Sequence, residues 1–127
     1  MRARTMLTLD YIESESILRL SGFTPADARR LMDACLALSQ NQASHALHTQ
    51  PWVRALDGVT LTMRVKTWNQ DVLTVGPRAF EWSLTAGAWD NVAGLIEPFC
   101  ESASNGFQWL NQASGDAEVL LSPQGDW

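Results

Sequence analysis

Hydrophobic and polar residues alternate with two different periods along this chain, and these periods predict its helices and strands. One apolar stripe has the three- to four-residue spacing of a helix, and its members are Ala28, Leu31, Cys35 and Leu38. Thr24 and Pro25 precede this stripe, and both residue types are favoured where a helix begins. The pattern predicts a helix that begins at Thr24 and fades in the polar run 39–42.

A second apolar stripe predicts a helix that starts after Thr85 and runs to about Glu101. Its members are Trp89, Val92, Ala93, Ile96, Phe99 and Cys100. Pro98 falls inside the stripe, where it removes one backbone hydrogen bond and clashes with the preceding turn. We therefore expect a kink or an early end near residues 96–97.

Strict alternation of apolar and polar residues predicts strands elsewhere. Residues 59–66 and 80–85 alternate cleanly, and Leu7, Leu9 and Tyr11 alternate in a shorter segment. Two further strands are expected at 17–21, before the first helix, and at 118–122, after the second. Residues 107–110 fit either a short strand or a turn of helix. Turn signals separate these segments, as at Asn105-Gly106 and Gly76-Pro77.

The resulting order is strand, helix, two strands, helix, strand, with further pieces at the start and between residues 67 and 78. This order predicts an α+β fold: an antiparallel β-sheet with two helices packed on one face. It corresponds to a split β-α-β, ferredoxin-like arrangement with an extra N-terminal strand, in a single domain of residues 1–127. Segments 18–37 and 80–99 share the same layout of a strand followed by a helix.

Charge narrows the classes of partner. The 127 residues carry 9 basic and 14 acidic side chains, for a net charge of −5. This balance argues against nucleic-acid binding, which relies on basic side chains that neutralise phosphates. It suits a basic protein partner, although acidity also simply keeps proteins soluble. Two cysteines do not make a secreted disulfide scaffold, and no apolar run approaches a membrane span, so we expect a cytoplasmic protein without a membrane segment.

Motifs that dictate a reaction are missing from the sequence. It contains no phosphate-binding glycine loop and no Gly-x-Ser-x-Gly motif. His45 and His48 have a spacing that suits a metal on a helix, but further ligands at a recognisable spacing are lacking. Cys35 lies on an apolar stripe, and Cys100 lies near a helix C-terminus, which does not stabilise a thiolate. We expect no enzyme, cofactor or metal site; an enzyme that uses His45 or His48 as a base is the least supported hypothesis.

Six tryptophans are the most informative part of the composition. Trp82 and Trp89 follow the strand and helix periods, which predicts that they are core residues. The other tryptophans follow neither stripe and are candidate interface anchors, since tryptophan is enriched at protein interfaces; they are Trp52, Trp68, Trp109 and Trp127. Two groups of acidic residues are candidate steering charges: Asp10, Glu13 and Glu15, and Asp116, Glu118 and Asp126.

These features together predict a small acidic protein-binding module. In its size, acidity and lack of a catalytic motif the chain resembles bacterial immunity proteins, which neutralise a cognate toxin. That resemblance implies binding to a basic toxin or effector domain and occlusion of its site. The alternative is a homo-oligomeric domain, for instance a homodimer, that binds a small ligand or has a regulatory role.

Overall fold

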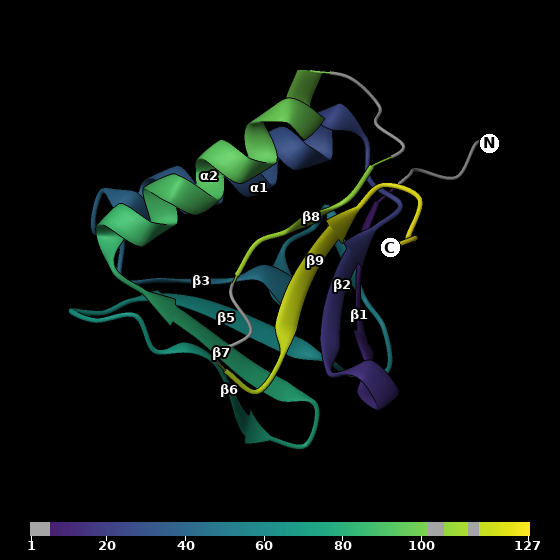
Figure 1. The fold of residues 1–127 in the computed structure, drawn as a ribbon, viewed down its shortest axis with the longest axis horizontal. Helices are drawn as coiled ribbons and strands as arrows, with labels where there is room; N and C mark the ends of the chain where they lie inside the picture. Colours follow the sequence, from purple (N-terminus) through teal and green to yellow (C-terminus); the bar gives the residue numbers. More distant parts are fainter. Residues whose placement is uncertain (1–5, 102–105, 112–114) are drawn as a thin grey trace.

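The computed structural model describes residues 6–101, 106–111 and 115–127, and within these ranges two helices lie side by side above two β-sheets (Figure 1). The helices are α1 (Pro25–Ser39) and α2 (Ala86–Glu101). In the described ranges, one sheet has five strands in the order β4-β1-β2-β9-β8, and the other has four in the order β3-β5-β7-β6. Their bounds are β1 (Leu7–Ile12), β2 (Ile17–Ser21), β3 (Ser44–Ala46), β4 (Val53–Ala55), β5 (Thr60–Val65), β6 (Asp71–Gly76), β7 (Ala79–Leu84), β8 (Gln108–Trp109) and β9 (Glu118–Ser122). Short 3-10 helices, η1 (Glu13–Glu15) and η2 (Leu47–Thr49), join some of these strands.

Helix α1 has Thr24 as its N-cap, as the sequence predicts, and the cap proves to be reciprocal. The Asp27 backbone N–H donates to Thr24 Oγ1 at 3.3 Å, and the Thr24 N–H donates to Asp27 Oδ2 at 3.2 Å. Each bond satisfies a backbone donor that a helix terminus leaves without a helical partner. Arg30 also forms an ion pair with Asp27 at 2.8 Å, which places its positive charge beside the buried carboxylate.

Helix α2 continues to Glu101, so the expected early end near residues 96–97 is wrong. Proline at position 98 leaves the carbonyl four residues earlier, that of Gly94, without its helical donor. Both Pro98 and Gly94 lie on the exposed side of the helix, so the missing bond is on the solvent side. Trp89, Val92 and Ile96 are buried on the opposite side and hold the helix against the core.

Each helix carries the chain from one sheet to the other. The hairpin of β1 and β2 belongs to the five-stranded sheet, and α1 leads from it to β3 in the four-stranded sheet; α2 leads back from the hairpin of β6 and β7 to β8. As a result, β2 pairs in parallel with β9, from Ile17↔Glu118 to Ser21↔Ser122. In the same way β7 pairs in parallel with β5. The first half of the chain (β1 to β5) and the second half (β6 to β9) thus share the order hairpin, helix, strand pair. The last strand of each half pairs with the hairpin of the other half.

The α+β class with two helices is confirmed, whereas the strands form two mixed sheets rather than one antiparallel sheet. The physical reason is the exchange between the halves, because a strand that follows a helix pairs with the hairpin of the other half. Parallel pairs require such long connections, while adjacent hairpins give antiparallel pairs. The likeness between segments 18–37 and 80–99 therefore extends to the hairpin before each helix and the strand pair after it.

Aromatic side chains join the layers in the core. Trp82 of β7 and Trp89 of α2 are fully buried, with ring centroids 4.7 Å apart, and Trp89 Nε1 donates to the Arg64 carbonyl at 2.8 Å. Tyr11 of β1 and Phe80 of β7 also have centroids 4.7 Å apart, so the inner faces of the two sheets meet there. The prediction that Trp82 and Trp89 are core residues is confirmed.

The segment before β9 is fastened to β6 of the other sheet. The Asp116 N–H donates to the Val72 carbonyl at 2.7 Å. Gly115 lies so close to the Val72 backbone that a Cβ atom at position 115 would overlap it, which explains the glycine. In the part of the chain that the structure describes, neither helix is long and apolar enough to cross a membrane.

Candidate interaction surface

One face of the five-stranded sheet points away from the core and carries most of the candidate residues. Leu9, Leu20 and Leu121 point into the core, so their alternating neighbours point outward. Cross-strand pairing places four residues of this orientation in one row across β1, β2, β9 and β8, namely Asp10, Arg19, Leu120 and Trp109, of which Leu120 is fully buried. We call this surface, together with the residues of η1 and residues 123–127 that border it, the outer sheet face.

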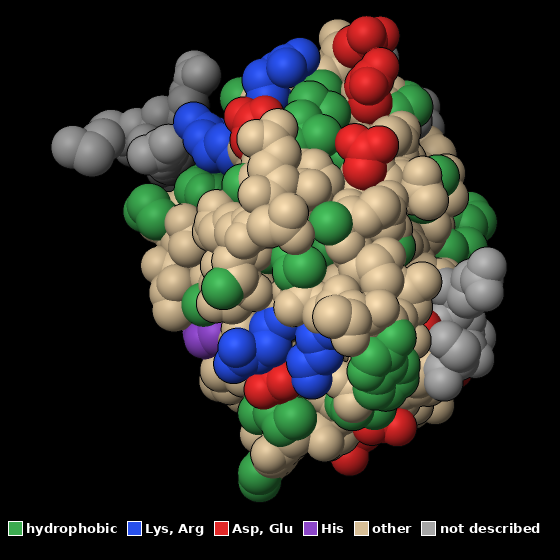
Figure 2. Space-filling model, turned by 90° about the vertical axis from the view of Figure 1, so that its left-hand side faces the viewer, with side chains coloured by type: hydrophobic (Ala, Val, Ile, Leu, Met, Phe, Trp, Pro, Cys, Tyr) green, Lys and Arg blue, Asp and Glu red, His purple; other side chains and the backbone are tan. Residues whose placement is uncertain are grey.

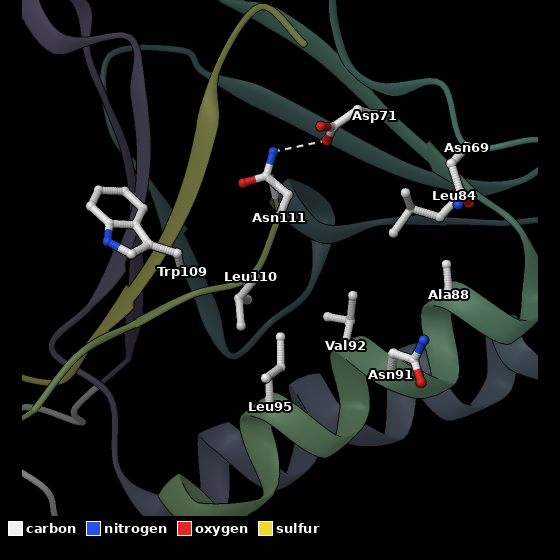
Figure 3. A pocket seen from close by; sticks show the side chains of 10 residues that line it. All are labelled: Asn69, Asp71, Leu84, Ala88, Asn91, Val92, Leu95, Trp109, Leu110 and Asn111. Carbon is white, nitrogen blue, oxygen red and sulfur yellow. Dashed lines mark hydrogen bonds between the residues drawn. The ribbon is translucent and has the colours of Figure 1, made fainter. Parts of the chain in front are cut away.

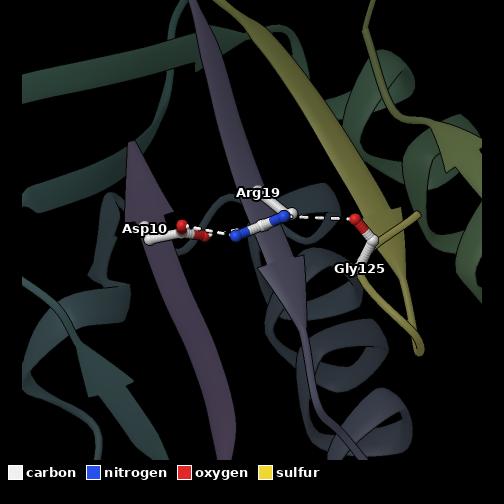
Figure 4. A network of polar contacts seen from close by, with 3 residues as sticks. All are labelled: Asp10, Arg19 and Gly125. Carbon is white, nitrogen blue, oxygen red and sulfur yellow. Dashed lines mark hydrogen bonds and ion pairs between the residues drawn. The ribbon is translucent and has the colours of Figure 1, made fainter. Parts of the chain in front are cut away.

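Arg19 lies at the centre of the outer sheet face and is held on both sides (Figure 4). Its Nε donates to Asp10 Oδ1 at 3.1 Å and its Nη2 to Asp10 Oδ2 at 2.8 Å, which makes a bidentate ion pair. Its Nη1 donates to the Gly125 carbonyl at 3.1 Å. Arg19 therefore neutralises Asp10 and fixes the segment after β9 to this face.

The two acidic groups of the sequence meet at the outer sheet face, except for Asp116, which contacts β6. Glu13 and Glu15 are exposed on η1, between β1 and β2, and the Glu118 N–H donates to the Ser16 carbonyl at 3.0 Å just beyond them. Asp126 is exposed and lies with Arg19 and Trp127 around a shallow hollow. Glu13, Glu15, Glu118 and Asp126 form no ion pair within the described residues, so their charge faces solvent.

Asp116 has a structural role that its position in the sequence does not reveal. Its Oδ2 accepts a hydrogen bond from the Thr74 N–H at 2.7 Å, and its own N–H binds the Val72 carbonyl. These bonds close the outward edge of β6. Although exposed, Asp116 is therefore committed to the contact between the two sheets.

Aromatic side chains gather at the β8 side of the outer sheet face. Trp109 is half-buried and lies opposite Leu120, and Phe107 is 46% exposed with its ring centroid 6.2 Å from that of Trp109. Trp127 is 50% exposed beside Arg19. Phe107 is absent from the candidates that the sequence suggests, although its alternation with Trp109 is a signal that both residues share one face of a strand.

Trp52 and Trp68 lie away from this surface. The proposal of Trp52 as an interface anchor is wrong, because its side chain is buried at 9% exposure and belongs to the core. The Trp52 carbonyl accepts a hydrogen bond from the Leu7 N–H at 3.1 Å, which holds this segment against the start of β1. Trp68 is 57% exposed in the connection between β5 and β6, so it is available but separate from the outer sheet face.

A pocket lies between β8, α2 and the start of β6 (Figure 3). Its volume is about 370 Å³. Its polar lining residues are Asn69, Asp71, Asn91 and Asn111, and its apolar ones include Leu84, Val92, Leu95 and Leu110. Asn111 is held in place, since its Nδ2 donates to Asp71 Oδ1 at 2.8 Å. We call this site the asparagine pocket; no pattern in the sequence brings these residues together.

The histidines and cysteines are parts of the fold. His48 Nδ1 accepts a hydrogen bond from the Leu61 N–H at 3.1 Å, and His45 lies on β3, where burial lowers its pKa. Cys35 and Cys100 are buried, and burial raises the pKa of both thiols, which disfavours the nucleophilic thiolate. Among the described residues, no group of three or more His, Cys, Asp or Glu is placed to hold a metal ion.

The left-hand side of the molecule in Figure 1 has a different character from the outer sheet face, since β1 and β2 lie at the right of that view. On this side Lys and Arg side chains lie both near the top and in a lower group, with Asp and Glu side chains beside them and hydrophobic side chains scattered between (Figure 2). On the four-stranded sheet, Arg64 is paired with Glu81 at 3.3 Å. Basic and acidic side chains are therefore intermixed on this side.

Comparisons with models of protein families, with curated proteins and with solved structures found no match. Any proposal about function therefore depends on the residues of this chain alone.

Proposed function

We propose that this protein is an acidic binding protein that inhibits a basic partner by occluding its site, in the manner of an immunity protein that neutralises a bacterial toxin. The observation that supports this most directly is the outer sheet face. It combines exposed aromatic side chains, Phe107 and Trp127, with carboxylates that have no ion-pair partner among the described residues. Aromatic anchors surrounded by charges are typical of tight, electrostatically steered complexes.

The two kinds of residue have different roles in this proposal. Glu13, Glu15 and Asp126 are exposed at the rim, where charges mainly accelerate association and little alter the lifetime of a complex. Phe107 and Trp127 supply apolar area that water leaves on binding, so they determine the dissociation rate. Arg19 positions the segment that carries Trp127 through its bond to the Gly125 carbonyl.

The experiment begins with the protein encoded next to this one in the genome, or with a protein captured from the source cell. The purified partner is assayed for toxicity or activity with and without this chain, and the association is followed by surface plasmon resonance. We expect inhibition at equimolar concentration. We expect Trp127→Ala to raise the dissociation rate about tenfold, the change that corresponds to about 1.4 kcal/mol at an interface anchor.

Trp68→Ala is the matched control, because Trp68 is as exposed as Trp127 but lies away from the outer sheet face. We expect it to leave both rates unchanged. Neutralising Glu13, Glu15 and Asp126 together should slow association at low salt and have little effect at high salt. An unchanged association rate at low salt would refute the electrostatic part, and a captured partner that stays fully active in the complex would refute inhibition.

The asparagine pocket favours one other candidate function, a small-ligand-binding domain that forms homo-oligomers. Its volume of about 370 Å³ lies in the range of small-molecule sites, and its lining combines apolar walls with a few polar groups. Such a domain would have a concentration-dependent mass in analytical ultracentrifugation and a higher melting temperature with its ligand. A monomer at all concentrations that responds to no metabolite would exclude it.

A further inference from the structure

Strand β8 is an edge of the five-stranded sheet with backbone groups that point outward. The Leu110 N–H donates to the Val119 carbonyl at 2.9 Å, which orients Leu110 and, by alternation, Gln108 toward β9. The N–H and carbonyl of Trp109 therefore point away from β9; the Gln108 side-chain amide donates to that carbonyl at 2.9 Å. An edge of this kind is a template for another extended chain.

The asparagine pocket lies directly beside this edge, and its chemistry suits a cationic side chain. Of the described residues that line it, Asp71 alone is charged; its carboxylate is buried and bound by Asn111, so it contributes its negative charge to the pocket from beneath the rim. The exposed carboxamide of Asn91 adds an oxygen acceptor, as does that of Asn69, whose Oδ1 also accepts from the Thr85 N–H at 2.8 Å; Leu84 and Leu95 provide apolar walls. An Arg or Lys side chain combines an aliphatic stem with a charged donor head, which matches walls of this kind and acceptors at the rim.

The connection within the strand pair after the helix differs between the two halves of the chain, and the asparagine pocket lies at the shorter of the two connections. The connection from β3 to β5 adds strand β4, which pairs with β1, and it buries Trp52 beside the start of β1. The connection from β8 to β9 is shorter and adds no strand among its described residues. The pocket lies at this shorter connection, between the edges of β6 and β8. The edge of β6 is closed by Asp116, whereas β8 has a strand partner on one side only within the described ranges.

We propose that an extended segment of the partner pairs with β8 and inserts an Arg or Lys side chain into the asparagine pocket. This inference depends on the proposed function, because it specifies how the partner of an acidic binding protein is held. The asparagine pocket is continuous with the outer sheet face, since Trp109 belongs to both. Alternate side chains of the added strand would lie in the pocket and against the aromatic side of the outer sheet face.

The test uses displayed random peptides selected on the intact protein, followed by affinity measurements on variants of α2. Asn91→Lys places a positive charge at the pocket, and Gly94→Lys places the same charge on the same helix outside it, where nothing lies within 4 Å. Asn91→Phe and Gly94→Phe form a second pair that tests for filled space. Both positions are exposed, and thermal melts check that the four variants remain folded.

We expect the selected peptides to share one basic position. Their affinity should fall at least about tenfold for the Asn91→Lys and Asn91→Phe proteins but less than about twofold for the two Gly94 variants. Hydrogen exchange at the Trp109 N–H should slow when peptide is bound. Selection of no peptide, of peptides without a shared basic position, or of peptides that bind Asn91→Lys normally would overturn the inference. Loss of binding with Trp127→Ala but not with Asn91→Lys would leave the proposed function intact and place the segment on the outer sheet face instead.

Discussion

The side chain of Asn111 joins the two sheets, and its removal provides the sharpest test of the fold. Its Nδ2 donates to Asp71 Oδ1 at 2.8 Å and to the Ala117 carbonyl at 3.1 Å, and its Oδ1 accepts from the Val119 N–H at 2.7 Å. Asp71 begins β6 in the four-stranded sheet, whereas Ala117 and Val119 lie at the start of β9 in the other. Asn111→Ala removes all three bonds together.

The magnitude follows from the kind of each bond. The bond to the Asp71 carboxylate contributes about 1.5–3 kcal/mol, and each bond to a neutral backbone group contributes about 1 kcal/mol. Asn111 is half-buried and lines a pocket that water enters, which lowers the sum. We expect Asn111→Ala to reduce the free energy of unfolding by about 3 kcal/mol and the melting temperature by about 10 °C.

A charge exchange distinguishes this bond from a general loss of packing. Asn111→Asp places a second carboxylate against Asp71 and should cost at least as much as Asn111→Ala. The double variant Asp71→Asn/Asn111→Asp restores one donor and one acceptor, and asparagine tolerates the φ of +66° at position 71. It should regain about 1–2 kcal/mol relative to Asn111→Asp.

Urea unfolding followed by tryptophan fluorescence measures these differences, because Trp82 and Trp89 are buried in the native protein. A cost of less than about 1 kcal/mol for Asn111→Ala would show that the contact does not join the sheets energetically. A double variant no more stable than Asn111→Asp would show that the bond to Asp71 is not the source of the effect.

Two further predictions concern a glycine pair and a histidine. Gly115→Ala should destabilise the protein by about 1–3 kcal/mol, because the new Cβ atom overlaps the Val72 backbone. Gly94→Ala, on the exposed side of α2, should stabilise the protein by about 0.5–1 kcal/mol. The melting temperatures of the two variants should therefore shift in opposite directions. Burial lowers the pKa of His45, so the unfolded chain binds protons more readily, and stability should decline as the pH falls below about 6.5. Urea midpoints at pH 7.5 and 5 should show this decline, and a decline of equal size in His45→Gln would assign it to other groups.

Local periodicity was sufficient to locate most elements of the fold. The predicted strands at 17–21 and 118–122 coincide with β2 and β9, and the helix predicted after Thr85 begins at Ala86 and runs to Glu101, without the early end expected before Pro98. Helix α1 begins after Thr24, and its cap was readable because threonine, proline and aspartate stand at fixed positions. The short strands β3 and β4 were missed, since three residues show no period.

The pairing of strands could not be read from the sequence for a physical reason. Alternation shows that a strand has one buried face, but it carries no information about which neighbour the strand has. The residues around the outer sheet face were therefore predicted as two separate acidic groups, whereas pairing of β2 with β9 brings Glu118 next to η1. Trp52 was misjudged because a tryptophan in a polar connection has no periodic signal of burial.

The exchange of strands between the halves also explains how the candidate surface depends on the whole fold. Asp10 and Arg19 come from the first half of the chain, while Leu120 and Trp109 come from the second. The row exists because β9 pairs with β2 across a long separation in sequence, and neither half contains an outer sheet face of its own. Formation of the surface must therefore be coupled to formation of both sheets. A variant that loosens the junction at Asn111 should weaken partner binding as well as stability, although Asn111 lies outside the outer sheet face.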